Sequence, residues 1–413
     1  MNLFKTKLVG PFKQLLTFAG IPPKGPVADE KLSVIEDAGI LLKGRFIEAV
    51  GGFDELIRDW KVRDAAIERL REDVVGLPGF VDAHTHICYA GSRALDYAMR
   101  NAGKSYLEIA RSGGGIWNSV QHTRNASDEV LAEGLTGRIN RHVKAGVTTM
   151  EVKSGYGLNL ETEIKMLKTI QKVNQQQSVD LIPTCLAAHI LPPDFDGNAG
   201  SYLRHLVRDL FPILLSEKLA SRIDIFVEET AFAYEVAKSY LIAAGRQGFD
   251  LTIHADQFTT GGSKLAVEVK AVSADHLEAS SEKEIAYLAK SDTTATVLPG
   301  ASLGLGMKFA PARSLLDAGG SLAIASDWNP GSAPMGDLLT QAALLGAYEK
   351  LTNAEVLAGL TVRAARALKL TDRGSLKPGL LADFIAFPCA DYREILYNQG
   401  ALRPCRVWKK GVR

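Results

Sequence analysis

The chain contains few cysteines, and they are widely spaced along the sequence. Among 413 residues only four are cysteine, and no two stand in a CxxC arrangement: Cys88, Cys185, Cys389 and Cys405. Scattered cysteines argue against a disulfide framework and are typical of a reducing compartment. We therefore expect a cytoplasmic protein whose fold does not depend on disulfide bonds.

Excess charge of one sign and long apolar runs are also missing. The formal net charge is +1, and no dense Lys/Arg run occurs, so a nucleic-acid partner is not expected. No stretch reaches 18 consecutive apolar residues, so we expect no membrane span. The N-terminal MNLFKTKLVGPFKQLLTFAG lacks the long apolar core and small-residue cleavage site of a secretion signal.

The remaining composition is that of an ordinary globular chain. Hydrophobic residues make up 46% and charged residues 23%, which supplies ample material for a core. The length accommodates two or three average domains, or one large barrel with an appendage.

From Leu77 onward, short apolar runs alternate with helical patterns. Eight strands are predicted, at residues 77–87, 147–154, 180–190, 223–229, 250–256, 273–277, 293–300 and 321–327. Helices are predicted between them, near 127–145, 159–177, 201–220, 231–245, 264–271, 281–290 and 311–318. Strand–helix alternation implies a parallel sheet, and eight units over about 250 residues predict a TIM-like (β/α)8 barrel. The alternative is an open doubly wound sheet, but no GxGxxG or GxxxxGK[ST] follows a predicted strand.

The two ends of the chain have a different pattern. Residues 1–76 and 374–413 carry short alternating runs punctuated by glycine and proline, such as AGILLKGRFIEAVG, GLLADFIAFP and PCRVWKKGV. We expect both ends to build one small β-sandwich domain beside a catalytic barrel formed by residues 77–373.

Histidines gather at the predicted carboxyl ends of strands. His84 and His86 are two residues apart on one strand, so they project from the same face, with Asp82 one step behind. Five of the eight histidines occupy such strand ends: His84, His86, His189, His254 and His276. That rim holds the active sites of (β/α)8 barrels. An HxH pair alone does not distinguish a metal site from buried structural histidines, because a catalytic metal usually needs at least three protein ligands. The other three histidines, His122, His142 and His205, are expected in helices without a chemical role.

Longer motifs carry a resemblance to a known family. PGFVDAHTH, IHAD and SDWNPGS resemble the amidohydrolase superfamily of metal-dependent hydrolases. Within it, HTHICYAGSR, YLEIARSGGGI, TTMEVKSGYGL, HADQ, SADHLE and SDWNPGSAP resemble the imidazolonepropionase family of histidine degradation. These motifs run from residue 78 to about 336, and GSLKPGLLADFIAF resembles the return of the chain to the superfamily's β domain.

The resemblance implies one metal ion, Zn²⁺ or Fe, per subunit. Its ligands would be His84, His86, His254 and Asp327. Superfamily members with two metals bridge them through a carboxylated lysine on the fourth strand, where this chain has IDIFVEE, with two glutamates and no lysine. A single ion is therefore expected. Lys153, on the second strand, is interpreted as structural or as an ion-pair partner behind the ligands.

The implied reaction is hydrolytic opening of the ring of 4-imidazolone-5-propanoate to N-formimino-L-glutamate. A bound metal would bring the pKa of water from about 15.7 toward 7. A base must take the water proton and return it to the leaving nitrogen, which suits His276 or Asp327, and the sequence does not decide between them. His189 is a candidate hydrogen-bond donor to the carbonyl or the developing oxyanion.

The resemblance also implies residues that bind the substrate. Arg93 would bind the propanoate tail, because a guanidinium pairs with a carboxylate in a bidentate manner and keeps its charge. Family members carry glutamate or glutamine three residues after the fifth-strand histidine. Gln257 stands there in this chain, and an amide suits ring binding and not proton transfer. Further contacts to the substrate are expected from Tyr106, Tyr156, Asn329, Gly331 and Ser332, and a homodimer is a family-based expectation.

Two other functions remain open at this point. A superfamily deaminase would share the metal ligands but usually places glutamate in the position of Gln257, and Arg93 favours a substrate with an acidic tail. A barrel that has lost activity would be expected to lack ligands or proton-transfer groups, and all of them are present.

Overall fold

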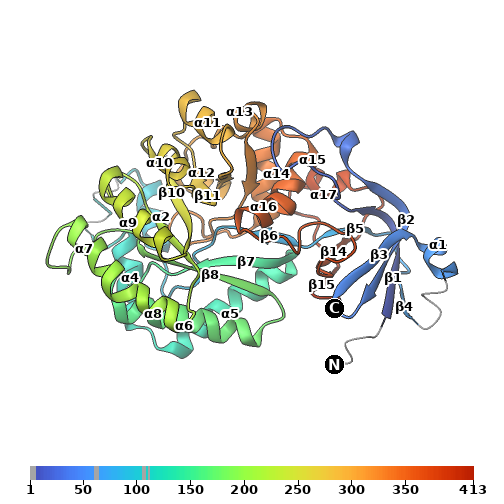
Figure 1. The fold of residues 1–413 in the computed structure, drawn as a ribbon, viewed down its shortest axis with the longest axis horizontal. Coiled ribbons are helices and arrows are strands. Elements are labelled where there is room, and N and C mark those ends of the chain that lie inside the picture. The colour runs from blue at the N-terminus through green and yellow to red at the C-terminus, as the bar shows by residue number, and fades with distance from the viewer. Residues whose placement is uncertain (1–5, 60–64, 105–107, 110–111) are drawn as a thin grey trace.

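The structure, a computed structural model, describes residues 6–59, 65–104, 108–109 and 112–413. It consists of a parallel barrel surrounded by helices and a second, mixed sheet beside it (Figure 1). The barrel lies on the left in that view, and the C-terminal end of the chain lies next to the second sheet. None of the described helices is long and apolar enough to cross a bilayer.

The barrel contains the eight strands predicted from the sequence. In spatial order they follow the chain, and each pairs in parallel with the next. They are β6 (Phe80–Asp82), β7 (Val147–Lys153), β8 (Asp180–Ala188), β9 (Arg222–Ile225), β10 (Asp250–Ala255), β11 (Ser273–His276), β12 (Thr294–Val297) and β13 (Ser321–Ile324). The predicted (β/α)8 barrel is therefore confirmed, and the open doubly wound sheet is wrong.

The seam between the last and first strands closes beyond their ends. The backbone N–H of Asp327 donates to the carbonyl of His84 over 3.0 Å, and the N–H of His86 donates to the carbonyl of Trp328 over 2.9 Å. Backbone pairing thus fixes two segments, one after β6 and one after β13, against each other. Three of the four expected metal ligands lie on these two segments.

Helices surround the barrel, and most agree with the predicted ranges. Ser127 caps α5, since its side chain accepts the amide hydrogen of Val130. The helix predicted over residues 201–220 is divided by a π-helical stretch, Leu206–Leu210. A helix that the sequence pattern did not indicate, α12, begins at Pro299, a residue suited to the first helical turn. The helices are α2 (Ala94–Asn101), α4 (Ile116–Asn125), α5 (Asp128–Lys144), α6 (Leu160–Gln176), α7 (Ala199–His205), α8 (Phe211–Ser216), α9 (Tyr234–Arg246), α10 (Gly262–Glu268), α11 (Glu282–Ala289), α12 (Pro299–Leu305), α13 (Ala312–Asp317), α14 (Leu338–Glu349), α15 (Asn353–Leu360) and α16 (Val362–Ala367).

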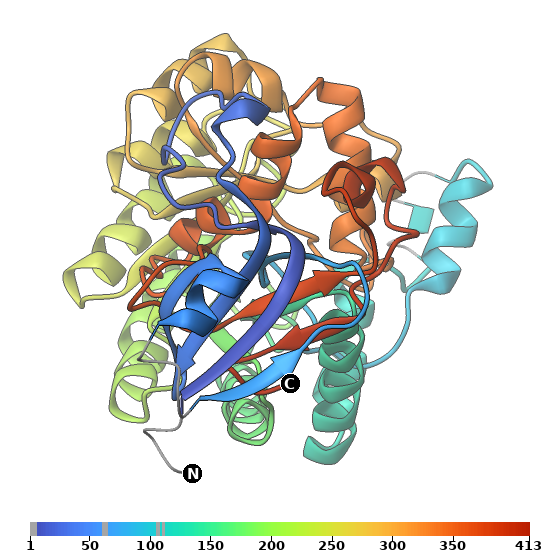
Figure 2. The same cartoon turned by 90° about the vertical axis from the view of Figure 1, so that its right-hand side faces the viewer.

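The second sheet takes strands from both ends of the chain, as predicted (Figure 2). Its order is β15-β14-β5-β1-β2-β3, with β4 paired to β1. Phe12, Phe384 and Trp408 form the centre of its own core, with the rings of Phe384 and Trp408 stacked at 4.6 Å. The strands are β1 (Thr6–Leu16), β2 (Val34–Lys43), β3 (Phe46–Gly52), β4 (Ala66–Arg69), β5 (Val75–Pro78), β14 (Phe384–Phe387) and β15 (Arg406–Trp408), accompanied by η1 (Asp29–Lys31), α1 (Phe53–Arg58) and α17 (Arg393–Tyr397). We propose the division into residues 1–76, 77–373 and 374–413 on this basis, with β5 crossing the first boundary.

Ion pairs join the two parts of the molecule at the amino-terminal end of the barrel. Asp180 begins β8 and contacts Arg373 at 2.5 Å, Lys409 at 2.8 Å and Lys410 at 2.7 Å. Lys409 also contacts Asp383 at 2.6 Å. The C-terminal strands are thereby fixed to the end of the barrel opposite the histidines.

Candidate metal centre

Four polar side chains meet inside the carboxyl-terminal end of the barrel. The Nε2 atoms of His84 and His86 are 3.1 Å apart, and those of His86 and His254 are 3.2 Å apart. Oδ1 of Asp327 lies 3.5 Å from Nε2 of His84 and 3.4 Å from Nε2 of His86. All four side chains are buried. The sequence-predicted ligand set is thus brought together at one point, from β10 and from the segments that follow β6 and β13.

These four atoms have the spacing that a single metal ion requires. Ligands placed tetrahedrally at about 2.0–2.1 Å from an ion lie about 3.3–3.4 Å from one another. Four of the six separations among these atoms are 3.1–3.5 Å and scatter around that value. Oδ1 of Asp327 is buried and accepts no hydrogen bond from the described residues, so the site presents an acceptor without a partner. The residues therefore fit one divalent ion, and an N/O ligand set suits both Zn²⁺ and Fe.

Carboxylates behind two of the histidines orient their rings. Nδ1 of His84 lies 2.7 Å from Oδ2 of Asp275, and Nδ1 of His254 lies 2.9 Å from Oδ2 of Asp224. A carboxylate only accepts, so each Nδ1 carries the proton and each Nε2 keeps a free lone pair. Burial lowers the pKa of His84 and brings that of His254 to about 3, which keeps both rings neutral. Neutral imidazole is the form that binds metals.

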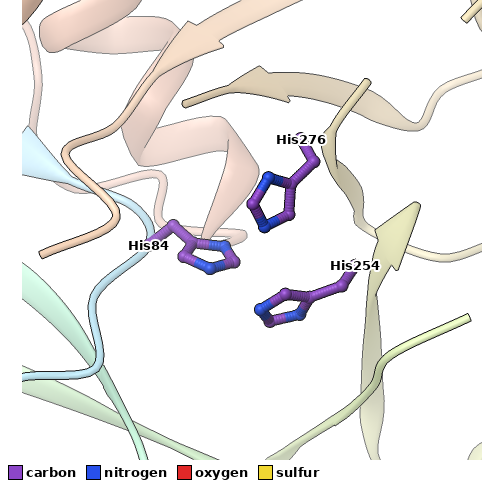
Figure 3. Close-up of side chains that lie close together, drawn as sticks. All are labelled: His84, His254 and His276. Atoms are coloured by element: carbon purple, nitrogen blue, oxygen red, sulfur yellow. The ribbon is translucent and has the colours of Figure 1, made fainter. Parts of the chain in front are cut away.

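His276 lies beside this centre, with its ring centroid 5.3 Å from that of His254 (Figure 3). Nitrogens of His84, His254 and His276 also come within 4.8 Å of one another, so His276 borders the same space. Its Nδ1 faces the carboxylate of Glu278 at 3.3 Å, which leaves Nε2 for the site. Burial lowers the pKa of His276, but the charges of Glu278 and Asp327 outweigh this and raise it.

Two of these residues occupy the left-handed region of backbone conformation. His276 has a φ of 88° and Asp327 a φ of 48°. For residues with a side chain such conformations cost of order 1–3 kcal/mol, and they persist where the surroundings hold them. Here the strain occurs in the two residues expected to carry protons.

Asn329 orients Asp327 through a tight turn. Its Oδ1 accepts the backbone N–H groups of Gly331 and Ser332 over 2.7 and 2.8 Å, and its Nδ2 donates to Oδ2 of Asp327 over 2.9 Å. Oδ2 is thereby occupied, and Oδ1 faces the histidines. Both polar atoms of the Asn329 amide form hydrogen bonds within this turn, and one of these bonds orients the carboxylate of Asp327.

Arg93 reaches the same turn from the segment after β6. Its Nε donates to Asp96 over 2.8 Å, which leaves the Nη1/Nη2 end of the guanidinium for an anion. Arg93 lies so close to Gly331 that a β-carbon there would come within 2.2 Å of Nη1. The cation expected to bind a carboxylate is therefore held next to the loop that carries the metal aspartate.

Two more of the predicted residues, Tyr156 and His189, pack against His86. Tyr156 is buried with its ring 6.1 Å from that of His86, and His189 stacks on His86 at 5.5 Å. Gln257 is buried just after β10. Tyr106 lies outside the described residues.

Two residues that were not expected to act on the substrate, Lys153 and His142, lie close to the metal centre. Lys153 is an ion-pair partner of buried carboxylates, one of the two interpretations made from the sequence. His142 lies in a helix as expected, but it is fully buried, with Nε2 3.2 Å from Oδ2 of Asp82 and its ring edge against Trp328. Asp82 in turn accepts the N–H of Ser326 and so supports the segment before Asp327.

Sequence reasoning missed the carboxylates that support the histidines. Asp224, Asp275 and Glu278 were not singled out, although Asp224 and Asp275 are charged residues on strands of a buried parallel sheet. A charge on a strand that is buried on both faces needs a partner, and this was the available indication. Glu228, one of the two glutamates where two-metal superfamily members carry a lysine, accepts the backbone N–H groups of Phe258 and Thr259.

A large cavity exists elsewhere but has none of this chemistry. It measures about 1110 Å³ and lies where β10, β11 and β12 begin, lined by residues such as Leu251, Val272 and Thr293. Barrel enzymes place catalytic groups at the opposite, carboxyl-terminal end. We therefore assign the site to the histidine cluster.

Comparison with known proteins defines the class of protein first. A model described as "Amidohydrolase family" matches residues 109–403, and the chain belongs to that family of hydrolases. The fold agrees with it. A triazine hydrolase from Arthrobacter aurescens superimposes with a TM-score of 0.72 at 16% identity, covering 98% of this chain and 94% of the other. An adenosine deaminase from Xanthomonas campestris with bound zinc gives 0.69 at 19%, covering 98% and 92%.

Sequence relatives then define the particular family. An imidazolonepropionase from Deinococcus deserti is 39% identical over 401 residues, which is 97% of each chain. One from Geobacillus kaustophilus is 38% identical over 407 residues, covering 97% of this chain and 95% of the other. One from Myxococcus xanthus is 40% identical over 336 residues, covering 81% and 80%. The chain belongs to the imidazolonepropionase family, which confirms the resemblance seen in its motifs.

Proposed function

We propose that the protein opens the ring of 4-imidazolone-5-propanoate by hydrolysis to N-formimino-L-glutamate, a step of histidine degradation. One observation carries this assignment beyond family membership. The four converging ligand atoms of His84, His86, His254 and Asp327 lie next to a turn that contacts Arg93. A hydrolytic centre and a carboxylate-binding cation therefore face the same space, as a small ring with a propanoate tail requires.

One Zn²⁺ or Fe ion per subunit is the proposed cofactor. When bound, a divalent ion would lower the pKa of water and polarise the amide carbonyl. The protein's contribution is a set of three imidazoles and one carboxylate, and a second residue orients three of these four side chains. His84 and His254 are oriented by Asp275 and Asp224, and Asp327 is oriented by Asn329.

His276 and Asp327 are proposed to move the protons. The Glu278 carboxylate beside Nδ1 of His276 stabilises its protonated form, so Nε2 can accept a proton from water and return it to the leaving ring nitrogen. Asp327 Oδ1 faces the same space and is the second acceptor. The amide nitrogen must leave protonated, because an amide anion is a poor leaving group.

His189 is proposed to accept a hydrogen bond from the substrate ring. Its Nδ1 lies 3.0 Å from the carbonyl oxygen of Gly155, and a carbonyl can only accept. Nδ1 therefore carries the proton. Burial lowers the pKa of His189, so the ring is neutral and Nε2 offers a lone pair. We therefore propose that Nε2 of His189 accepts a hydrogen bond from a ring N–H, whereas from the sequence we expected His189 to donate one.

The other binding residues are proposed as the walls of the pocket. Arg93 binds the propanoate, Tyr156 and Gln257 border the ring, and Gly331 and Ser332 hold the turn beside it. Tyr106 remains a proposal from the family motif alone. We further propose a cytoplasmic homodimer, and all four cysteines being free is in keeping with a reducing compartment.

The assignment is tested with purified protein and 4-imidazolone-5-propanoate. Loss of substrate absorbance, formation of N-formimino-L-glutamate and one equivalent of Zn or Fe by elemental analysis are expected. A chelator should abolish turnover, and the metal should restore it. Absence of turnover with the metal in place would contradict the proposal. Ammonia release from amino-substituted heterocycles would point to a deaminase instead.

A further inference from the structure

A lysine is buried inside the barrel directly behind the metal ligands. Lys153, the last residue of β7, has a fully buried side chain. Its Nζ lies 2.7 Å from Oε2 of Glu151, 2.8 Å from Oδ2 of Asp224 and 3.8 Å from Oδ2 of Asp275. A buried ammonium is costly unless it is paired, so these carboxylates and the lysine form one unit.

Two of its partners are the carboxylates that orient the metal histidines. Oδ2 of Asp224 contacts both Nζ of Lys153 and Nδ1 of His254, at 2.8 and 2.9 Å. Oδ2 of Asp275 lies 3.8 Å from Nζ and 2.7 Å from Nδ1 of His84. One ammonium group therefore lies against the same oxygen atoms that fix two ligand rings on different strands.

The third partner, Glu151, does not depend on Lys153 in the same way. It accepts the hydroxyl hydrogen of Thr184 and lies 3.4 Å from Nε of Arg222. Among the described residues, no other Lys or Arg side chain forms an ion pair with Asp224 or Asp275. Without it, two buried carboxylates near each other would repel and lose their fixed orientation.

We propose that Lys153 is a positioning residue of the metal centre: its ammonium holds the Asp224 and Asp275 carboxylates so that His254 and His84 present Nε2 to the same ion. The inference rests on the proposed metal site and goes beyond it, because it assigns metal affinity to a residue that touches neither ion nor substrate. Outer groups that orient ligands typically contribute about 10–100-fold to metal affinity.

The test compares zinc binding by the wild-type protein and Lys153→Met, which removes the charge at similar length. Competition with a chromophoric chelator should show zinc affinity weakened by about 10–100-fold. The visible absorption of the Co²⁺-substituted protein should change as well, since the ligand field depends on ring orientation. Activity should recover in excess zinc, because the groups that touch substrate are intact.

Two controls separate positioning from general stability. Lys409→Met removes another buried lysine, one that pairs with Asp180 and Asp383 at the far end of the barrel. It should lower thermal stability and leave zinc affinity within about twofold. Glu151→Gln keeps the ammonium of Lys153 and its contacts with Asp224 and Asp275, and should weaken zinc affinity less than Lys153→Met does.

The outcomes are distinguishable. Unchanged zinc affinity and an unchanged Co²⁺ spectrum in Lys153→Met would overturn the inference and leave the metal site intact. A wild-type protein that binds no zinc or iron would contradict the proposed function itself. If Lys153→Met does not fold, Lys153→Gln is measured in the same way, and native zinc affinity in that variant overturns the inference.

Discussion

Gly331 and Arg93 are in steric contact across the carboxyl-terminal end of the barrel: a β-carbon at Gly331 would lie 2.2 Å from Nη1 of Arg93. The turn cannot shift easily to make room, because Asn329 holds the N–H of Gly331 and Arg100 donates to its carbonyl. The absence of a side chain at residue 331 therefore sets the position of the arginine.

Gly331→Ala is expected to displace Arg93 and weaken binding of the propanoate tail. Misplacement of a binding group by about 1 Å can cost about 100-fold in rate. We expect kcat/KM to fall by about that factor, mainly through KM, with metal content unchanged. Gly137→Ala is the control, since a β-carbon there meets nothing within 4 Å. A native KM in Gly331→Ala would show that Arg93 does not bind the substrate.

Glu278 is expected to affect turnover through His276. Glu278→Gln removes the charge 3.3 Å from Nδ1 of His276 and should lower kcat by about 10–100-fold with little change in KM. His276→Asn should cost about 10²–10⁴-fold, the usual range for a general acid–base group. Steady-state kinetics on metal-saturated protein measures both. Ser302→Ala removes another contact of Glu278, at 3.1 Å, and should be nearly silent. Equal losses in Ser302→Ala and Glu278→Gln would contradict the assignment.

Glu163 holds the loop that carries Tyr156. This buried carboxylate on α6 accepts the backbone N–H groups of Gly155, Gly157 and Leu158 over 3.1, 2.8 and 2.9 Å. Glu163→Gln replaces an acceptor-only group with one that places a donor toward N–H groups. We expect a loss of about 1–3 kcal/mol in the free energy of unfolding and a raised KM. Urea denaturation and kinetics check this, and a stable variant with native KM would contradict it.

The features that follow from local periodicity could be predicted from the sequence. Alternating apolar runs and helical patterns identified all eight barrel strands, and the HxH spacing placed His84 and His86 on one face. The confirmed family resemblance added His254 and Asp327, which lie far along the chain but at equivalent strand ends. In the structure these four side chains meet within hydrogen-bonding distances.

What could not be predicted depends on contacts across the barrel. Asp275 supports His84 from a position 191 residues away, and Arg93 meets Gly331 only because the seam closes between β13 and β6. Such pairs leave no periodic pattern in the sequence. His142 was correctly placed in a helix, because helices follow local periodicity. Its burial against Asp82 depends on a contact between α5 and β6 and was not predicted.

Asp180 is expected to make stability depend on pH. Burial alone would raise the pKa of its carboxyl, but Lys409, Lys410 and Arg373 outweigh this and hold the pKa well below its usual range. The unfolded chain has a pKa near 3.9, so the unfolded state binds the proton first as pH falls. The stabilisation is therefore complete well above pH 4 and is lost as pH falls below 4 toward the folded-state pKa.

Asp180→Asn should lower the free energy of unfolding by about 1.5–3 kcal/mol at pH 7, the range for hydrogen bonds to charged groups. The difference in unfolding free energy between wild-type and variant should shrink at pH 3. At that pH the unfolded wild-type chain is largely protonated at Asp180, so the ion pairs stabilise the folded state by less. Urea unfolding at pH 7, 5 and 3, with chelator present throughout, removes the contribution of metal binding. Asp37→Asn, at an exposed residue 3.6 Å from Lys13, should change stability by less than about 0.5 kcal/mol. An Asp180→Asn gap of equal size at pH 7 and pH 3 would show that the charge of Asp180 does not hold the two parts of the molecule together.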